Sequence, residues 1–213
     1  MSRKKTKESK SPQQRRREEE RDLRREAILH AALHLFARQG YTETTLTGIA
    51  NQARLGKATL YYYFPDKETI FWTIYTEETT HYYRRIAEQI LDIRDPVEIV
   101  RNYVLEYIEY GFRNPDFLRL IFPVGKSSLL GTEAHRQYQQ QVDQVRQPLD
   151  IHLHEVLEQN RSPLTGDELT SLLWTIMSGL SLKIVQGSSQ ETVRNEAERL
   201  LSLVTSQLEG DGA

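Results

Sequence analysis

The residues best suited to bind a polyanion are concentrated in one short segment, residues 57–63. This segment supplies an amine, a hydroxyl and three phenols, from Lys57, Thr59, Tyr61, Tyr62 and Tyr63. Such groups donate hydrogen bonds to phosphate oxygens or to the edges of bases. A helix with so many phenols and so little apolar bulk would make a poor core element. The segment is therefore a candidate surface for contact with nucleic acid.

Short helices must position these side chains. Helical periodicity predicts a helix over 45–53, begun by Thr45 or Thr44, and another over 57–64, with only a few residues between them. Ala50 and Ala53 are small enough to let the two helices approach closely. A longer helix precedes them and ends at Gly40; its apolar face comprises Ile28, Ala31, Ala32, Leu35 and Phe36. This is a helix-turn-helix layout, in which the second helix enters the major groove of DNA.

Charge is distributed unevenly along a chain whose net charge is only −2. Residues 1–67 contain 15 Lys/Arg and 8 Asp/Glu, whereas residues 68–213 contain 13 and 22. A basic front and an acidic remainder suggest that only the front meets a polyanion. Residues 1–14 are predicted to be a disordered arm, and the arginines that follow could extend the contact with DNA or simply be solvated: Arg15, Arg16, Arg17, Arg21, Arg24 and Arg25.

Residues 27–68 resemble the DNA-binding domain of the TetR family of bacterial transcriptional regulators. The matching pieces are Ala31-Ala32-x-x-Leu35-Phe36-x-x-x-Gly40-Tyr41, Thr44-Thr45-x-x-x-Ile49-Ala50, Thr59-Leu60-Tyr61-x-Tyr63-Phe64 and Asp66-Lys67-Glu68. The resemblance implies that Lys57 and Ala58 face base edges, and that Thr59, Tyr61, Tyr62 and Tyr63 divide between phosphates and bases. It implies phosphate contacts for Thr45 and Lys67, and internal packing for Leu60 and Phe64.

Two positions depart from the family pattern. Arg54 stands in the turn where the family usually has glycine, so this residue is expected either to be strained or to add a phosphate contact. Gly56 stands where the family often has serine or a similar capping residue; glycine leaves the first amides of the next helix open to water or phosphate. Both departures affect the turn that aims the second helix.

The remainder of the chain is predicted to be helical as well. Helix starts are marked by Asp66, Asp95-Pro96 and Asn114-Pro115, and by the capping boxes Thr165-x-x-Glu168 and Ser188-x-x-Glu191. Pro148 predicts a kink or break within 132–160, and residues 123–131 form the longest uncertain connection. The fold class is all-α with about nine helices. The predicted division is the arm 1–14, a helix-turn-helix domain over 15–67 and an effector-binding and dimerisation domain over 68–213.

The family resemblance implies a small-molecule effector in the second domain and a homodimer through the last two helices, 165–186 and 190–208. Candidate pocket residues are aromatic or apolar with polar tips: Tyr82, Tyr103, Tyr107, Phe117, Phe122, Tyr138, Trp174 and Met177. The expected pairing faces are Leu169, Leu173, Ile176, Leu180 and Ile184, then Val193, Ala197, Leu200, Leu201 and Val204. A two-fold protein reads an inverted-repeat operator, from which a ligand would release a repressor.

Several other functions are less consistent with the sequence. The chain has no cysteine, no apolar run of the ~20 residues that cross a bilayer, and no signal peptide at its start, so a soluble cytoplasmic protein is expected. The histidine pairs 30/34 and 152/154 do not suggest a metal site, and we expect no cofactor and no catalytic residues. The alternatives are a helical ligand-binding protein or enzyme that does not act on DNA, and an activator or DNA-organising protein. Salt-dependent DNA binding would exclude the first alternative.

Overall fold

Helices form all the regular structure of the computed structural model, which describes residues 11–121 and 132–208. Within these ranges there are nine helices and no strand, so the all-α prediction is confirmed. Their bounds are α1 (Pro12–Glu43), α2 (Leu46–Gln52), α3 (Lys57–Tyr63), α4 (Lys67–Ile90), α5 (Pro96–Arg113), α6 (Pro115–Ile121), α7 (Glu133–Gln159), α8 (Gly166–Val185) and α9 (Gln190–Leu208).

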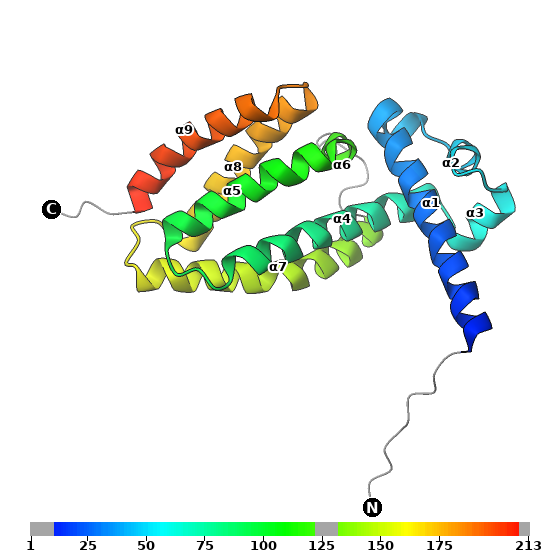
Figure 1. The fold of residues 1–213 in the computed structure, drawn as a ribbon, viewed down its shortest axis with the longest axis horizontal. Coiled ribbons are helices and arrows are strands. Elements are labelled where there is room, and N and C mark those ends of the chain that lie inside the picture. The colour runs from blue at the N-terminus through cyan, green and yellow to red at the C-terminus, as the bar shows by residue number, and fades with distance from the viewer. Residues whose placement is uncertain (1–10, 122–131, 209–213) are drawn as a thin grey trace, which may run out of the picture.

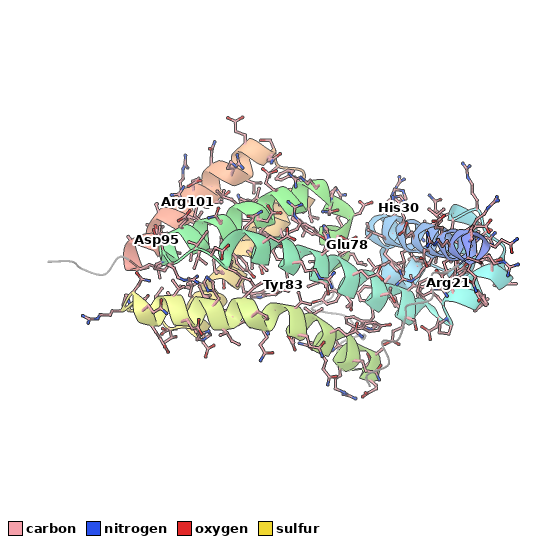
Figure 2. The ribbon with its side chains drawn as sticks, turned by 60° about the horizontal axis from the view of Figure 1, so that its bottom comes forward. Arg21, His30, Glu78, Tyr83, Asp95 and Arg101 are labelled. Carbon is pink, nitrogen blue, oxygen red and sulfur yellow. The ribbon has the colours of Figure 1, made fainter. Side chains whose placement is uncertain are left out.

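The helices fall into two groups joined by α4. Helices α1, α2 and α3 lie at one end, and α4 runs from them into a bundle with α5, α7, α8 and α9 (Figure 1). Helix α4 packs along α7, α5 packs along α9, and α6 bridges the bundle to α1. Arg101 of α5, labelled in Figure 2, forms an ion pair with Glu198 of α9 at 2.8 Å. This architecture places the predicted reading helix, α3, at the far end from α9.

Helix α1 begins earlier than the sequence pattern indicated, because residues 11–14 form a capping box. The Ser11 hydroxyl accepts from the backbone N–H of Gln14, and the Gln14 side chain accepts from the backbone N–H of Ser11. Pro12 occupies the first helical position, where its missing N–H is harmless. The predicted disordered arm 1–14 is therefore wrong for residues 12–14. Gly40 breaks the regular helix as predicted, with φ of 84°, before one last turn.

Three helices end in the same motif, with one residue in the left-handed region. Arg54 after α2, Arg161 after α7 and Gly187 after α8 have φ of 57°, 52° and 88°. In each case the following residue donates its N–H back across the last turn, as Leu55 does to the Ala50 carbonyl at 2.9 Å. Only Gly187 adopts this conformation without steric cost. The strain expected at Arg54 from its departure from glycine is thus present in the backbone.

One other boundary prediction is wrong, and of the two outcomes expected at Pro148, a kink or a break, the break is absent. The residue that caps α9 is Ser189, whose hydroxyl accepts from the Thr192 N–H at 3.2 Å, and not Ser188. Ser188 is instead used to close the end of α8, where its N–H reaches the Lys183 carbonyl. Helix α7 continues through Pro148 without a break. The predicted connection 123–131 lies outside the described residues, whereas the caps at Asp66, Asp95 and Thr165 are confirmed.

Candidate DNA-contacting surface and ligand cavity

The reading helix α3 is held by apolar residues on one side only. Leu60 and Phe64 are buried in the core of the N-terminal domain, together with Ile49 and Ala50 of α2. Thr45 caps α2, accepting from the Gly48 N–H at 3.0 Å. Gly56 precedes α3 and makes no side-chain cap. Leu60 and Phe64 therefore pack inside, as the family resemblance implied.

The opposite side of α3 displays the polar and aromatic residues. Lys57 and Ala58 are exposed, and Tyr61 and Tyr62 are 47% and 77% exposed. Tyr63 is half-buried and makes an edge contact with Tyr62, with 5.2 Å between ring centroids. Thr59 is also half-buried, and Thr45 is exposed. We call Lys57, Ala58, Tyr61 and Tyr62 the α3 face.

Lys67 donates hydrogen bonds to backbone carbonyls that could not be predicted from the sequence. Its ammonium donates to the carbonyls of Tyr41, Thr42 and Thr44 at 2.7, 3.2 and 2.8 Å. Burial lowers the pKa of Lys67, although the Glu43 carboxylate opposes this shift. The ammonium also lies 4.3 Å from the centre of the Tyr41 ring. Lys67 therefore fastens the end of α1 to the start of α4, and a phosphate would have to share its ammonium with these carbonyls.

The arginines of α1 differ in whether they form ion pairs with another helix or only within α1. Arg25 forms an ion pair with Glu77 of α4, and its guanidinium lies 5.9 Å from the Phe64 ring centre. Arg24 and Arg21 make only local pairs, with Glu20 at 3.6 Å and Asp22 at 3.7 Å. Figure 2 shows Arg21 on the part of α1 that extends past the bundle. The inner arginine thus anchors the domain, while the outer ones remain solvated.

A cavity lies inside the bundle, among α4, α5, α7 and α8. Its volume is about 490 Å³, within the range of small-molecule sites. Aromatic lining residues are Tyr75 and Tyr83 of α4, Tyr103 of α5 and Trp174 of α8. Charged and polar lining residues are Thr79, His135, Gln139, Asp143, Arg146, Asp150, Asp167, Thr170 and Ser171. Trp174 is 69% exposed, so it stands at the open edge.

The predicted pocket residues divide into two groups. Tyr103, Trp174 and Met177 line the cavity. The others that the structure describes do not: Tyr82 is buried behind it against Met177, Tyr107 bonds to Ser181, Phe117 is in the core, and Tyr138 stacks near Trp72. These four side chains are therefore packing residues in this structure. Phe122 lies outside the described residues.

The sequence reasoning missed the charged wall of the cavity. Asp143, Arg146 and Asp150 follow one another at helical spacing on α7, and Arg146 forms ion pairs with both aspartates, at 3.1 and 2.9 Å. Burial is the main cause that raises the pKa of Asp150, and Arg146 partly offsets it. An i, i+3, i+7 charge series within an otherwise amphipathic helix was the available signal, but such a series usually marks a solvated face.

Most residues of the predicted dimerisation faces are buried in the core of the chain itself. Leu169, Leu173, Leu180 and Ile184 of α8 are buried, as are Val193, Ala197 and Leu201 of α9. The apolar residues that α8 leaves exposed are others: Leu172, Trp174 and Leu182, the first and last of them 41% and 39% exposed. They accompany the exposed Thr175 and Gly179, and we call Leu172, Thr175, Gly179 and Leu182 the α8 face.

Helix α8 is also the one helix of the described residues that is long and apolar enough, by length and composition, to cross a membrane. Only 33% of its apolar stretch is buried in the chain. Part of this helix is therefore exposed as apolar surface, at Leu172, Trp174 and Leu182.

The N-terminal helices α2 and α3 lie in a segment whose sequence matches a known protein family. Residues 28–72 match the family model described as bacterial regulatory proteins, tetR family. The N-terminal domain belongs to the TetR family. This matched segment contains α2, α3 and the start of α4, and hence the whole α3 face of the TetR-family domain.

Similarity over longer stretches is weaker. The chain is 29% identical over 105 residues to the transcriptional repressor NicS of Pseudomonas putida, an alignment that covers 49% of this chain and 50% of NicS. Its matched part spans about half the length, or less, of the first curated relatives.

Two solved structures with bound ligands share the fold. A regulator from Saccharomonospora viridis in complex with choline is 21% identical, with a TM-score of 0.63, over 84% of this chain and 95% of that one. AibR in complex with isovaleryl coenzyme A and operator DNA is 21% identical, with a TM-score of 0.58, over 87% and 98%. Both therefore have the same arrangement of a helix-turn-helix domain and a helical bundle.

The histidines and acidic groups of the described residues do not gather into a cluster that could hold a metal ion. The His152 ring is buried and lies 3.0 Å from the carbonyls of both Ile90 and Ile93. His34 pairs with Asp116 of α6 at 3.3 Å, which links the TetR-family domain to the bundle.

Proposed function

We propose that this chain is a homodimeric transcriptional regulator that binds an inverted-repeat operator and is released from it by a small molecule. The observation that carries the proposal is the α3 face. It places an amine and phenols outward on a helix whose other side, Leu60 and Phe64, is fixed in the core. A helix displayed in this way fits the major groove, where donors meet phosphates and base edges.

The α8 face supports the part of the proposal that concerns a homodimer. Leu172 and Leu182 are exposed on one side of α8, and between them Gly179 has no heavy atom within 4 Å of the position of a Cβ. A second copy of α8 would cover this stripe and could approach closely at the glycine. A two-fold dimer built in this way would present two α3 faces, and these would read two half-sites in opposite directions.

The cavity supports the part of the proposal that concerns a small-molecule ligand. Its lining residues in the described part of the chain all come from helices of the bundle, so a bound molecule would act on DNA through a change in helix positions and not by blocking α3. NicS is named as a repressor, and AibR was solved with both a ligand and operator DNA. We extend repression and ligand response to this chain as part of the proposal.

Helix α4 offers the route between the cavity and α3. Trp72 of α4 is fully buried and stacks on the ring of His135, a cavity residue of α7, with centroids 4.8 Å apart. The Trp72 indole donates to Glu68 at 3.4 Å, one residue after Lys67, which holds the end of α1. A ligand that shifts α7 at His135 would therefore push on the start of α4, and so on the spacing of the two α3 faces.

Selection from a random duplex library followed by a gel shift tests the proposal. Wild-type protein should enrich an inverted repeat, and its affinity should fall steeply with salt. A variant with Lys57→Ala and Tyr62→Ala should enrich nothing while it stays folded and dimeric. Enrichment of direct or single sites, or equal binding by the variant, would contradict the proposal.

A further inference from the structure

The charged residues that line the cavity are mostly acidic. Asp143 and Asp150 of α7 and Asp167 of α8 supply three carboxylates, and Arg146 supplies the one guanidinium among the lining residues. The side chain of Asp167 is 99% exposed and is screened by solvent, so the carboxylates that matter at the cavity wall are Asp143 and Asp150, which outnumber Arg146 two to one.

The guanidinium of Arg146 is already engaged by two of these carboxylates. It donates to Asp143 at 3.1 Å and forms an ion pair with Asp150 at 2.9 Å. An anionic ligand would have to displace them, and would then lie beside the acids it had displaced. Burial, with the nearby Asp143 and Asp167 carboxylates, raises the pKa of Asp150 despite Arg146 and His154. At this wall two carboxylates share a single guanidinium.

The rest of the lining is suited to a cation with an apolar body. The rings of Tyr75, Tyr83, Tyr103 and Trp174 surround the space, and aromatic faces attract organic cations. Burial raises the pKa of Tyr83 to about 12, so its phenol is neutral at neutral pH. The side chains of Ile90, Ile99, Leu149, Leu153 and Met177 complete an apolar wall for a hydrocarbon tail.

We propose that the effector is a lipophilic organic monocation, whose quaternary or protonated amine lies between the carboxylates of α7 and the aromatic rings while its tail follows the apolar wall. This inference rests on the proposed function only in taking the cavity as the effector site. The fold does not decide the charge, because the two ligand-bound neighbours hold a choline cation and an acyl coenzyme A. The lining of this chain favours the cation.

Three probes of equal chain length test the proposal on the full-length protein. Octyltrimethylammonium, octanol and octanoate share the tail and differ in the charge of the head. Calorimetry and the quenching of Trp174 fluorescence should rank them cation first, neutral second and anion last. Octanoate binding as tightly as the cation, or no binding of the cation up to millimolar concentration, would overturn the proposal.

Two variants separate charge recognition from simple packing. Asp150→Asn should weaken cation binding roughly tenfold, as expected for loss of one partly screened charge, without lowering the melting temperature. Arg146→Gln should tighten cation binding, because it frees both aspartates, whereas an anion site would lose binding. The control is Asp92→Asn, an exposed carboxylate in the α4–α5 connection that does not line the cavity. Weaker cation binding by Arg146→Gln in a folded protein would count against the proposal.

The regulatory function and the cationic effector can be contradicted independently of each other. Ligand binding is measured without DNA, so a protein that ranks the probes as expected but binds no operator contradicts only the regulatory function. A protein that binds an inverted repeat but prefers octanoate contradicts only the cationic effector. In the combined experiment, octyltrimethylammonium should release wild-type protein from DNA at lower concentration than it releases Asp150→Asn.

Discussion

The α3 face and the α8 face are both exposed sides of helices with large side chains, yet their chemistry is opposite. The α3 face offers Lys57 and the phenols of Tyr61 and Tyr62. The α8 face offers Leu172 and Leu182, with Gly179 between them. Phenols and amines keep their hydration until a polar partner replaces it, whereas exposed leucines favour any surface that removes water.

The difference shows why exposure alone does not identify a binding surface. The side chains of α3 can satisfy a polyanion and are also compatible with water in its absence. Those of α8 are compatible with a second copy and leave an apolar stripe when alone. In the proposed dimer, the α8 face would have to pair before two α3 faces could act together.

The largest expected effect comes from placing charge on the α8 face. Leu172→Glu with Leu182→Glu should dissociate the dimer and weaken operator binding about a thousandfold, because buried unpaired carboxylates cost several kcal/mol. Sedimentation and fluorescence anisotropy measure the two losses. The control Ile151→Glu changes another exposed apolar residue, on α7, and should alter neither. A double variant that remains dimeric would show that the α8 face is not the pairing surface.

The next effect lies on the α3 face. Lys57→Ala and Tyr62→Ala should each weaken operator binding by about 1–3 kcal/mol, as lost base or phosphate contacts do. Neither should change the oligomeric state or the melting temperature, because both side chains are exposed. Filter binding at several salt concentrations checks this. If only the salt slope changes and sequence preference remains, the residues contact phosphates alone.

The next prediction concerns a buried ion pair. Its loss should destabilise the fold without changing the α3 face or the α8 face. Glu106 of α5 is almost buried and accepts from Arg85 at 2.6 Å and Gln89 at 2.8 Å, both on α4. Glu106→Gln should lower the free energy of unfolding by about 2 kcal/mol at neutral pH, discounted for the partly exposed Arg85. Urea denaturation measures it.

The pH dependence of that loss has a defined sign. Burial acts to raise the pKa of Glu106, but the hydrogen bonds from Arg85 and Gln89 outweigh it, so the pKa is lowered on folding. Its contribution is therefore present above the unfolded pKa and is lost as the pH falls through the folded one. The gap between wild type and Glu106→Gln should shrink below about pH 4. A gap that is constant with pH would exclude the ionised carboxylate as its source.

The smallest effect concerns the turn before α3. Arg54→Gly should raise the free energy of unfolding by about 1 kcal/mol, because glycine removes the strain of the left-handed conformation but loses more entropy on folding. Thermal denaturation measures this gain, and Gly187→Ala should show the opposite sign at the same kind of position. Operator binding should keep its sequence preference; a lower salt slope would reveal a phosphate contact from Arg54.

Much of the TetR-family domain was predictable because its function depends on local features. The spacing of Leu60 and Phe64 on one side of a short helix, and of Lys57, Tyr61 and Tyr62 on the other, is fixed by helical geometry. Thr45 and Asp66 cap helices within three residues of themselves. Lys67 was the exception, since its carbonyl partners lie at least 23 residues away along the chain.

The bundle was less predictable because its surfaces depend on which helices meet. The sequence by itself determined that the chain is helical, where most helices begin, and that residues 57–63 form a polar, tyrosine-rich helix, since these follow from periodicity and capping. It did not determine which side of α8 faces inward, because both sides of that helix are apolar. Only the tertiary structure decided that Leu173 is core and Leu172 is surface, and that Asp143, Arg146 and Asp150 face a cavity. The physical reason is that a cavity or an interface is made by several helices together, so no single segment encodes it.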